Sequence, residues 1–351
     1  MVSLLRHTNF TTFVYFKNQL VERSIIEKAI EKFSELKVIV IGDAMVDSYL
    51  WGRVDRISPE APIPIVTVTK QENRLGGAAN VSMNLQSLGA TPFLVSIIGD
   101  DSKGKKFQNL MVKNGLSSEG IFVKNDRMTT VKTRIISGGK QISRIDEEIS
   151  TMVDLPTENM LFEKVRELIG KARIDIVLFV DYDKGVVTPG LIEKVVALAK
   201  ERNILTAADP KIRNFNSYLN VDLFKPNFKE FTDGLRLNIE KTDLDKIKEA
   251  AEKFKKEHHI GLMFITLSEN GVFISNGLTQ NHFPAEVRDI ADVSGAGDTV
   301  FAVASLSLAA GLPPKFIALL SNLAGGLVCE RPGVVPIEKE RLKTEAVKIL
   351  V

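Results

Sequence analysis

The feature that most constrains the fold is an alternation of short, uninterrupted apolar runs with longer amphipathic segments. The apolar runs cover residues 36–42, 93–99, 175–182, 204–209 and 261–267. Runs of this length are typical of strands that are buried on both faces of a sheet. The helix-like segments among them cover residues 157–173, 189–202 and 243–259. Strands that alternate with helices form parallel sheets with right-handed crossovers, so the sequence predicts a doubly wound α/β core.

Two regions, 63–69 and 130–146, break this alternation. Strand-like segments follow one another there without intervening helices, and Gly138-Gly139 has the pattern of a hairpin turn. We expect a small antiparallel sheet built from about 48–70 and 120–146. Because such a sheet is not stable alone, it should lean on the ligand-bearing edge of the core or on a partner chain. A lid over a ligand and a plain surface hairpin both fit this pattern.

The composition indicates a globular protein with a small-molecule partner. The 46 Lys and Arg residues nearly balance 44 Asp and Glu residues, and no basic tract indicates binding to nucleic acid or an anionic membrane. The single cysteine, Cys329, excludes an internal disulfide and a multi-cysteine zinc site, which fits a cytoplasmic protein. No apolar stretch approaches the ~18 residues of a membrane span. We expect residues 1–35 to be an extension ahead of a single domain at 36–351.

The most informative motif is at 291–312, where Gly295-Ala296-Gly297 lead directly into an apolar helix. Glycines let successive N–H groups converge, and the helix N-terminus adds its positive dipole end, so this turn suits a phosphate. Asp298 lies beside those donors. It could act as a base that takes a proton from a hydroxyl during phosphoryl transfer, or it could simply cap the helix.

A second cluster surrounds the first strand. Gly76-Gly77 open a helix-like stretch and permit a close backbone approach to a ligand, while Asn80 offers an amide to hydroxyls. Asp43 and Asp47 follow the first apolar run, where ligands of open α/β sheets gather. These carboxylates could bind sugar hydroxyls, or they could be a turn residue and a helix cap.

Two weaker motifs follow later strands. Asn227 and Glu230 are three residues apart, a spacing that lets both face one water or metal shell on a helical turn. A solvated helix start explains the same pattern. The segment 266–271 then offers a hydroxyl and backbone donors after a strand.

In this order, the motifs GDAMVD, Gly-Gly-x-x-Asn, GDD-x-x-G, N-x-x-E, T-L-x-x-x-G and D-x-x-GAGD make residues 37–337 resemble the PfkB or ribokinase-like family of sugar kinases. The resemblance implies a ribokinase-like α/β/α core with a β lid, and ATP and Mg²⁺ as cofactors. It makes Asp298 the base and the amides of Gly295, Ala296 and Gly297 the anion site. The implied sugar ligands are Asp43, Asp47, Gly76, Gly77 and Asn80. The implied nucleotide and metal region comprises Asn227, Glu230, Thr266, Ser268, Gly271 and Asn322, with Mg²⁺ near Asn227 and Glu230.

Within the family, the chain is most similar to the kinases of D-glycero-β-D-manno-heptose 7-phosphate. The stretches that carry this similarity are 56–66, 74–90, 143–148, 181–185, 208–211 and 266–269. The acceptor would be the C1 hydroxyl, and the product would serve ADP-heptose and lipopolysaccharide synthesis. The 7-phosphate needs a cationic counterpart. We expect Arg144 above all, with Lys184, Lys132 and Arg134 as further candidates.

Many heptose kinases are fused to an adenylyltransferase with an H-x-G-H signature, which this sequence lacks. We therefore expect a separate adenylyltransferase to act downstream. Relatives often pair through their lids, so a homodimer is a further expectation, and a monovalent cation requirement stays open. Two alternatives remain: another PfkB-type sugar or nucleoside kinase, and a sugar-sensing protein that has lost its chemistry.

Overall fold

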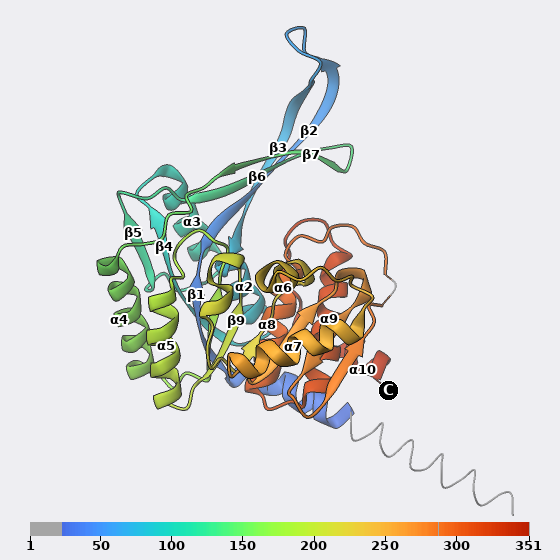
Figure 1. Ribbon diagram of the computed structural model, residues 1–351. Helices are drawn as coiled ribbons and strands as arrows, with labels where there is room; N and C mark the ends of the chain where they lie inside the picture. Colours follow the sequence, from blue (N-terminus) through green and yellow to red (C-terminus); the bar gives the residue numbers. More distant parts are fainter. Residues whose placement is uncertain (1–22, 287, 351) are drawn as a thin grey trace, which may run out of the picture.

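The computed structural model describes residues 23–286 and 288–350 (Figure 1). Within these ranges, nine strands form a central sheet in the order β13-β12-β11-β10-β9-β8-β1-β4-β5. In chain order their bounds are β1 Lys37–Gly42, β4 Thr91–Gly99, β5 Ile121–Lys124, β8 Ile176–Val180, β9 Leu205–Asp209, β10 Leu223–Phe224, β11 Leu262–Thr266, β12 Val272–Ser275 and β13 Gln280–Phe283. The strands from β5 to β11 run parallel, which confirms the predicted doubly wound core.

Helices cover both faces of this sheet. One layer contains α4 Leu155–Lys171, α5 Pro189–Glu201, η2 Ile212–Ser217, α6 Phe228–Leu235 and α7 Leu244–Glu257. The other contains η1 Phe33–Glu35, α2 Ala78–Ser87, α3 Ser102–Lys113, α8 Ala296–Ala309, α9 Pro314–Cys329 and α10 Lys339–Leu350. Strand β1 shows why its run is continuously apolar: Val38 and Val40 pack into one layer, while Ile39 and Ile41 pack into the other. Both side-chain rows of the strand therefore lie in a core.

The lid is a separate sheet that projects from the body in Figure 1. Over the described chain its strand order is β3-β2-β6-β7. The bounds are β2 Ala44–Ile57, β3 Pro64–Gly77, β6 Thr130–Ser137 and β7 Lys140–Glu147. The predicted hairpin turn at Gly138-Gly139 joins β6 to β7.

Two details of the lid differ from the sequence prediction. The sheet is mixed rather than wholly antiparallel, because the chain passes through α2, β4, α3 and β5 before it returns, and β6 then pairs with β2 in parallel. The predicted second segment also begins too early. Residues 121–124 pair with β4 as the edge strand β5 of the central sheet and are not part of the lid.

The beginning of the described chain belongs to the folded unit. Residues 23–32 are helical, and Ile26, Ile30 and Phe33 are buried in the same core cluster as α8 and α9. The folded unit therefore includes residues from 23 onward rather than from 36, while residues 1–22 of the expected extension lie outside the described part. Among the described helices, none combines the length and apolar character that crossing a membrane requires.

Candidate active site

The glycine turn ahead of α8 brings two helix starts together. Gly295 caps the helix with a φ of 80°, a left-handed conformation that glycine adopts without steric cost. A Cβ atom at this position would lie 3.0 Å from Nδ2 of Asn80, on α2. The Ala296 N–H donates to the Val293 carbonyl at 3.3 Å. The positive end of the α8 dipole therefore lies beside Asp298, in the first turn of the helix.

The carboxylate of Asp298 is buried, and both of its oxygens accept hydrogen bonds. Asn80 Nδ2 donates to Oδ2 at 2.7 Å, and the Tyr182 hydroxyl donates to Oδ1 at 2.7 Å. Burial raises the pKa of Asp298 to about 6, while both donors act to lower it and the charge of Asp209 acts to raise it. A carboxylate with a pKa close to neutrality is suited to general-base work at neutral pH.

The paired glycines hold the chain close to the first strand. Gly77 caps α2 with a φ of 59°, and a Cβ atom there would lie 2.3 Å from the Asp43 carbonyl oxygen. A Cβ atom at Gly76 would lie 2.2 Å from Oδ2 of Asp47. Only glycine fits at these two positions, and the consequence is that Asn80 points at Asp298 from the first turn of α2.

Asp43 has contacts that differ from the sequence expectation. Its Oδ2 accepts from the N–H groups of Tyr182 and Lys184 at 2.8 and 3.0 Å, and its Oδ1 accepts from the Val186 N–H at 3.0 Å. The carboxylate is buried, which raises its pKa despite these hydrogen bonds. Asp43 therefore holds the loop after β8 in place, and both of its oxygens accept hydrogen bonds from backbone groups.

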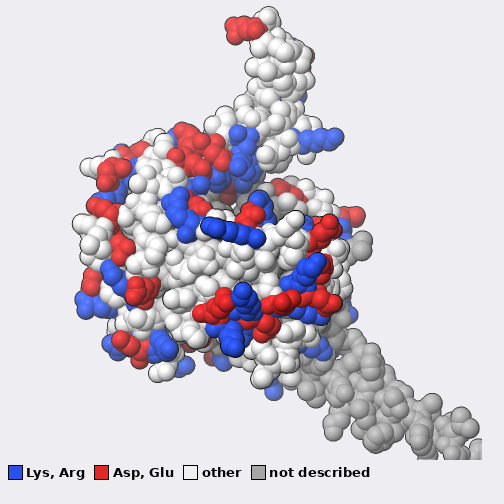
Figure 2. All heavy atoms as spheres, viewed as in Figure 1, with Lys and Arg blue, Asp and Glu red and all other residues white. Residues whose placement is uncertain are grey.

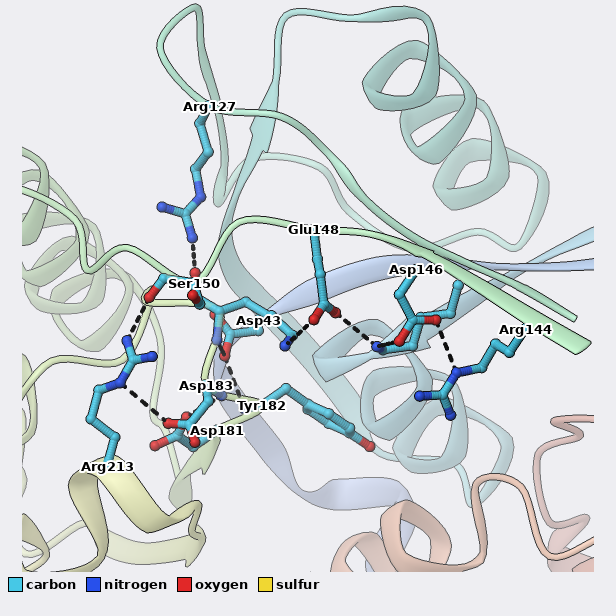
Figure 3. Close-up of polar contacts among 12 residues, drawn as sticks. Asp43, Arg127, Arg144, Asp146, Glu148, Ser150, Asp181, Tyr182, Asp183 and Arg213 are labelled. Atoms are coloured by element: carbon cyan, nitrogen blue, oxygen red, sulfur yellow. Dashed lines mark hydrogen bonds and ion pairs between the residues drawn. The ribbon is translucent and has the colours of Figure 1, made fainter.

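The expected phosphate-binding cations gather at the base of the lid, where Figure 2 shows basic and acidic side chains side by side. Arg144 pairs with Asp146 at 2.9 Å, and Lys132 contacts both Asp146 and Glu148 at 2.8 Å. Lys184, on the loop after β8, pairs with Glu148 at 2.8 Å (Figure 3). These side chains form one chain of ion pairs between the lid and the core.

Arg134 and Asp47 form a further lid contact. Arg134 Nη1 lies 2.5 Å from Oδ1 of Asp47, and the Arg134 side chain faces the ring of Tyr49 at 5.4 Å. Asp47 is a lid residue on β2 and does not lie at the end of the first strand, because β2 begins at Ala44. Asp47 and the cationic candidates thus come together, although each is already paired with an opposite charge.

A pocket of about 460 Å³ opens beside the glycine turn. Its size lies within the range of pockets that hold nucleotide-sized ligands. It is lined by residues that the sequence assigned to the nucleotide, namely Asn227, Thr266, Ser268, Gly271 and Asn322. Ala296 and Gly297 line the same pocket. The pocket therefore runs from the strand ends to the first turn of α8, where Asp298 lies.

Asn227 and Glu230 form a capping box at the start of α6. Asn227 Oδ1 accepts from the Glu230 N–H at 2.8 Å, and Glu230 Oε2 accepts from the Asn227 N–H at 2.8 Å. The other oxygen of Glu230 forms an ion pair with Lys211. The described residues contain no group of three or more acidic, histidine or cysteine side chains that could hold a metal. Mg²⁺ that arrives with a nucleotide needs only one or two protein carboxylates. Glu230 is the only carboxylate of this pair, and both of its oxygens are already engaged, by the Asn227 N–H and by Lys211.

Four residues near Asp298 were not assigned from the sequence: Tyr182, Asp209, Lys211 and Lys225. Lys225 and Asp209 form a buried ion pair at 3.0 Å, and Lys211 Nζ lies 5.4 Å from the centre of the Tyr182 ring. Burial acts against the charge of Lys211, but the charges of Asp209 and Glu230 outweigh it and raise its pKa. Each of the four follows or ends one of the strands β8, β9 and β10. Their place at the carboxyl ends of these strands could have indicated from the sequence that they belong to the site.

Comparisons with known proteins identify the family. The sequence model described as pfkB family carbohydrate kinase matches residues 35–340. The curated protein "Bifunctional protein HldE" of Syntrophotalea carbinolica is 36% identical over 323 residues, which is 92% of this chain and 65% of that protein. The protein of the same name from Helicobacter pylori strain 26695 is 38% identical over 299 residues, 85% of this chain and 64% of that protein. The chain thus spans slightly less than two thirds of the length of these relatives.

Solved structures share the fold. Phosphofructokinase-2 from Escherichia coli in complex with potassium has a TM-score of 0.74 at 16% identity, covering 90% of this chain and 99% of that one. A putative ribokinase from Agrobacterium tumefaciens has a TM-score of 0.69 at 17% identity, covering 89% and 97%. At these identities the likeness establishes a ribokinase-like fold.

Proposed function

The chain belongs to the pfkB family of carbohydrate kinases, and on that premise we propose that it phosphorylates D-glycero-β-D-manno-heptose 7-phosphate at the C1 hydroxyl. The sequence stretches that resemble heptose kinases support this substrate, as do relatives that carry the name HldE. The product would be the 1,7-bisphosphate. In this proposal an adenylyltransferase activity consumes the product on the route to ADP-heptose.

The observation that carries the proposal is that Asn80 meets Asp298 beside the Gly295 turn, while Ala296 and Gly297 of the same helix start line the nucleotide-sized pocket. Phosphoryl transfer to a hydroxyl needs a base beside a site that holds the transferring group. Asp298 takes the proton of the C1 hydroxyl, and the start of α8 receives the negative charge of the phosphoryl group. Asn80 orients the Asp298 carboxylate and reaches the same space as the sugar.

The pocket lined by Asn322, Ser268 and Gly271 accepts the nucleotide in this proposal. Mg²⁺, when bound, neutralises charge on the triphosphate. Glu230 and Asn227 would hold the metal through water. Lys211 already neutralises Glu230, so a positive charge lies next to this carboxylate before any nucleotide arrives.

The 7-phosphate would bind at the base of the lid, among Arg144, Lys132 and Lys184. Arg144 is the best candidate because its side chain is half exposed, at 50%, whereas Lys132 and Lys184 are largely covered by Asp146 and Glu148. A phosphate at Arg144 competes with a single carboxylate. A bidentate guanidinium contact is the usual way in which proteins bind such a group.

We also propose a homodimer that pairs through the lid. The sheet exposes large apolar side chains, among them Ile57, Ile63, Val68 and Ile145, each at least half exposed. An exposed apolar patch of this kind on a projecting sheet is typical of an interaction surface. Light scattering tests this directly, because a chain of 38.8 kDa should then have twice that mass in solution.

The test of function is an ADP-release assay with heptose 7-phosphate beside ribose, fructose 6-phosphate and a nucleoside. We expect turnover with the heptose 7-phosphate at a kcat/KM well above the others, and a new C1 phosphate signal in the ³¹P spectrum. Equal turnover of unphosphorylated sugars would contradict the 7-phosphate assignment. ADP release with none of the sugars, together with retained ligand binding, would favour a sensing protein.

A further inference from the structure

Tyr182 lies beside the carboxylate of Asp298, although the sequence stretch 181–185 that contains it indicated no role for this side chain. Its hydroxyl donates to Oδ1 of Asp298 at 2.7 Å, from a loop 116 residues away in the sequence. We propose that Tyr182 is a positioning residue of the kinase reaction, which holds the Asp298 carboxylate in the orientation that accepts the proton of the sugar hydroxyl. This inference rests on the proposed function, since it assigns Asp298 the role of base.

The first argument is the geometry of the carboxylate. Tyr182 donates to one oxygen of Asp298 from the loop after β8, and Asn80 donates to the other from α2. A single donor would leave the carboxylate free to rotate about its bond to Cβ. Two donors on opposite oxygens fix the carboxylate plane. Each oxygen still has a second lone pair, so a substrate hydroxyl can approach without displacing either donor.

The second argument is that Tyr182 is itself held firmly. Its N–H donates to Oδ2 of Asp43, the buried carboxylate that also anchors the N–H groups of Lys184 and Val186 (Figure 3). The ammonium group of Lys211 lies 5.4 Å from the centre of the Tyr182 ring. Asp43 therefore acts on Asp298 through the loop that carries Tyr182, which explains a buried carboxylate that contacts only backbone groups.

The third argument concerns the charge on Asp298. The polar groups that influence it are the donors Asn80 and Tyr182, the carboxylate of Asp209 and the ammonium groups of Lys225 and Lys211. Burial raises the pKa of Asp298. The hydrogen bonds from Asn80 and Tyr182 stabilise the charged carboxylate and so act to lower the pKa. Without the Tyr182 hydroxyl, the pKa of Asp298 should therefore rise above its present value of about 6.

The test compares Tyr182→Phe with the wild type and with Tyr218→Phe as a matched control. Tyr218 is fully buried, and its hydroxyl contacts Asp181 at 3.2 Å rather than Asp298. We expect the acid limb of kcat/KM to move to higher pH in Tyr182→Phe only, with KM for ATP unchanged. A one-unit move lowers activity about tenfold on the acid side of the limb, and the lost orientation of the carboxylate lowers the alkaline plateau as well.

A uniform loss of activity at every pH, with an unmoved limb, would overturn the inference and leave Tyr182 a structural residue. A second variant, Tyr182→3-fluorotyrosine, keeps the shape of the side chain and strengthens its donor. It should move the limb in the opposite direction, to lower pH, and an unmoved or raised limb would also overturn the inference.

A measurement without substrate separates this inference from the proposed function. The carboxyl carbon of Asp298 can be followed by ¹³C NMR in protein labelled at aspartate, with Asp298→Asn identifying its signal. We expect a higher pKa in Tyr182→Phe than in the wild type and no change in Tyr218→Phe. If the wild type phosphorylates no sugar, the proposed function fails. If the Asp298 signal titrates identically in Tyr182→Phe and the wild type, the inference fails.

Discussion

Asn80 and Asp298 are separated by 218 residues, yet Asn80 Nδ2 lies 2.7 Å from Oδ2 of Asp298. On the next residue of α8, the Thr299 hydroxyl donates at 3.0 Å to Oδ1 of Asn84, which lies one turn further along α2 than Asn80. The start of α2, where the sequence placed the sugar, is thus bonded directly to the start of α8, where it placed the base. A sugar bound at Asn80 would therefore present its hydroxyl within reach of Asp298.

The pKa of Asp298 predicts the pH range of activity. The base must be unprotonated, so activity should be lost as the pH falls through about 6, well above the 3.8 of an ordinary aspartate. A profile of kcat/KM from pH 4.5 to 8.5 measures the limb, and circular dichroism at each pH checks that the fold is retained. A limb close to pH 4 would contradict the assignment of a buried aspartate as the base.

Gly295→Ala should impair catalysis more than stability. At a φ of 80° the substitution costs about 1 kcal/mol of backbone strain. The new methyl group would also press against Nδ2 of Asn80 and move it from Asp298. The matched control is Gly311→Ala just beyond the other end of α8, where φ is 86° and nothing lies within 4 Å of the added atom.

Both variants should lose a similar free energy of unfolding in denaturant titrations. Only Gly295→Ala should lose turnover, by roughly tenfold or more, because small misplacements of reacting groups are costly. Equal activities in the two variants would show that the contact between the turn and Asn80 has no part in catalysis.

Gly297→Ala should separate nucleotide handling from folding. A Cβ atom at Gly297 meets nothing within 4 Å, and the residue lies in the first turn of α8, where alanine favours the helix. The free energy of unfolding should therefore stay the same or rise. The methyl group points into open space at a position that lines the nucleotide-sized pocket, so ATP should bind more weakly. Calorimetry measures the affinity for ATP. An unchanged affinity would contradict the assignment of the ATP phosphates to the glycine turn.

Arg144→Ala should weaken the binding of the sugar phosphate. A charged hydrogen bond to the 7-phosphate, partly screened by solvent, predicts that KM for heptose 7-phosphate rises about tenfold while KM for ATP does not change. Arg53→Ala is the matched control, because Arg53 is another exposed lid arginine that faces an aspartate two residues along the chain. If KM for heptose 7-phosphate rises equally in both variants, the overall charge of the lid causes the effect, and the assignment of the 7-phosphate to Arg144 is contradicted.

Much of the fold was predictable because the strands are continuous apolar runs buried on both faces, as Val38–Ile41 of β1 illustrate. The hairpin of β12 and β13 was not predicted, since its strands are four residues each and β13, Gln280–Phe283, is largely polar. The parallel pairing of β2 with β6 was not predicted either, because it depends on where the chain returns to the lid after it has crossed the core.

For the site, too, features that depend on local sequence patterns were predicted, and contacts that depend on the path of the chain were not. The ordered motifs predicted that Asn80, Asp298 and the pocket residues belong to one site, because each motif lies at the same edge of the sheet. In the structure Asn80 contacts Asp298, and residues of the later motifs line one pocket. For Asp43 the sequence left two interpretations open, since a carboxylate at a strand end can face a ligand or the backbone of the next loop. Its hydrogen bonds to that backbone depend on the path of residues 181–186. Tyr182 was missed because its contact with Asp298 depends on that same path.

The central claim is that the Asp298 carboxylate removes the proton of the acceptor hydroxyl beside the start of α8. Asp298→Asn keeps the shape of the side chain and its contact with Tyr182 but cannot take up the proton. The most direct measurement is single-turnover ADP release by this variant with saturating ATP and heptose 7-phosphate, beside calorimetric binding of both ligands. We predict retained binding and a rate about 10²–10⁴-fold below the wild type. Turnover within a few-fold of the wild type would contradict the account.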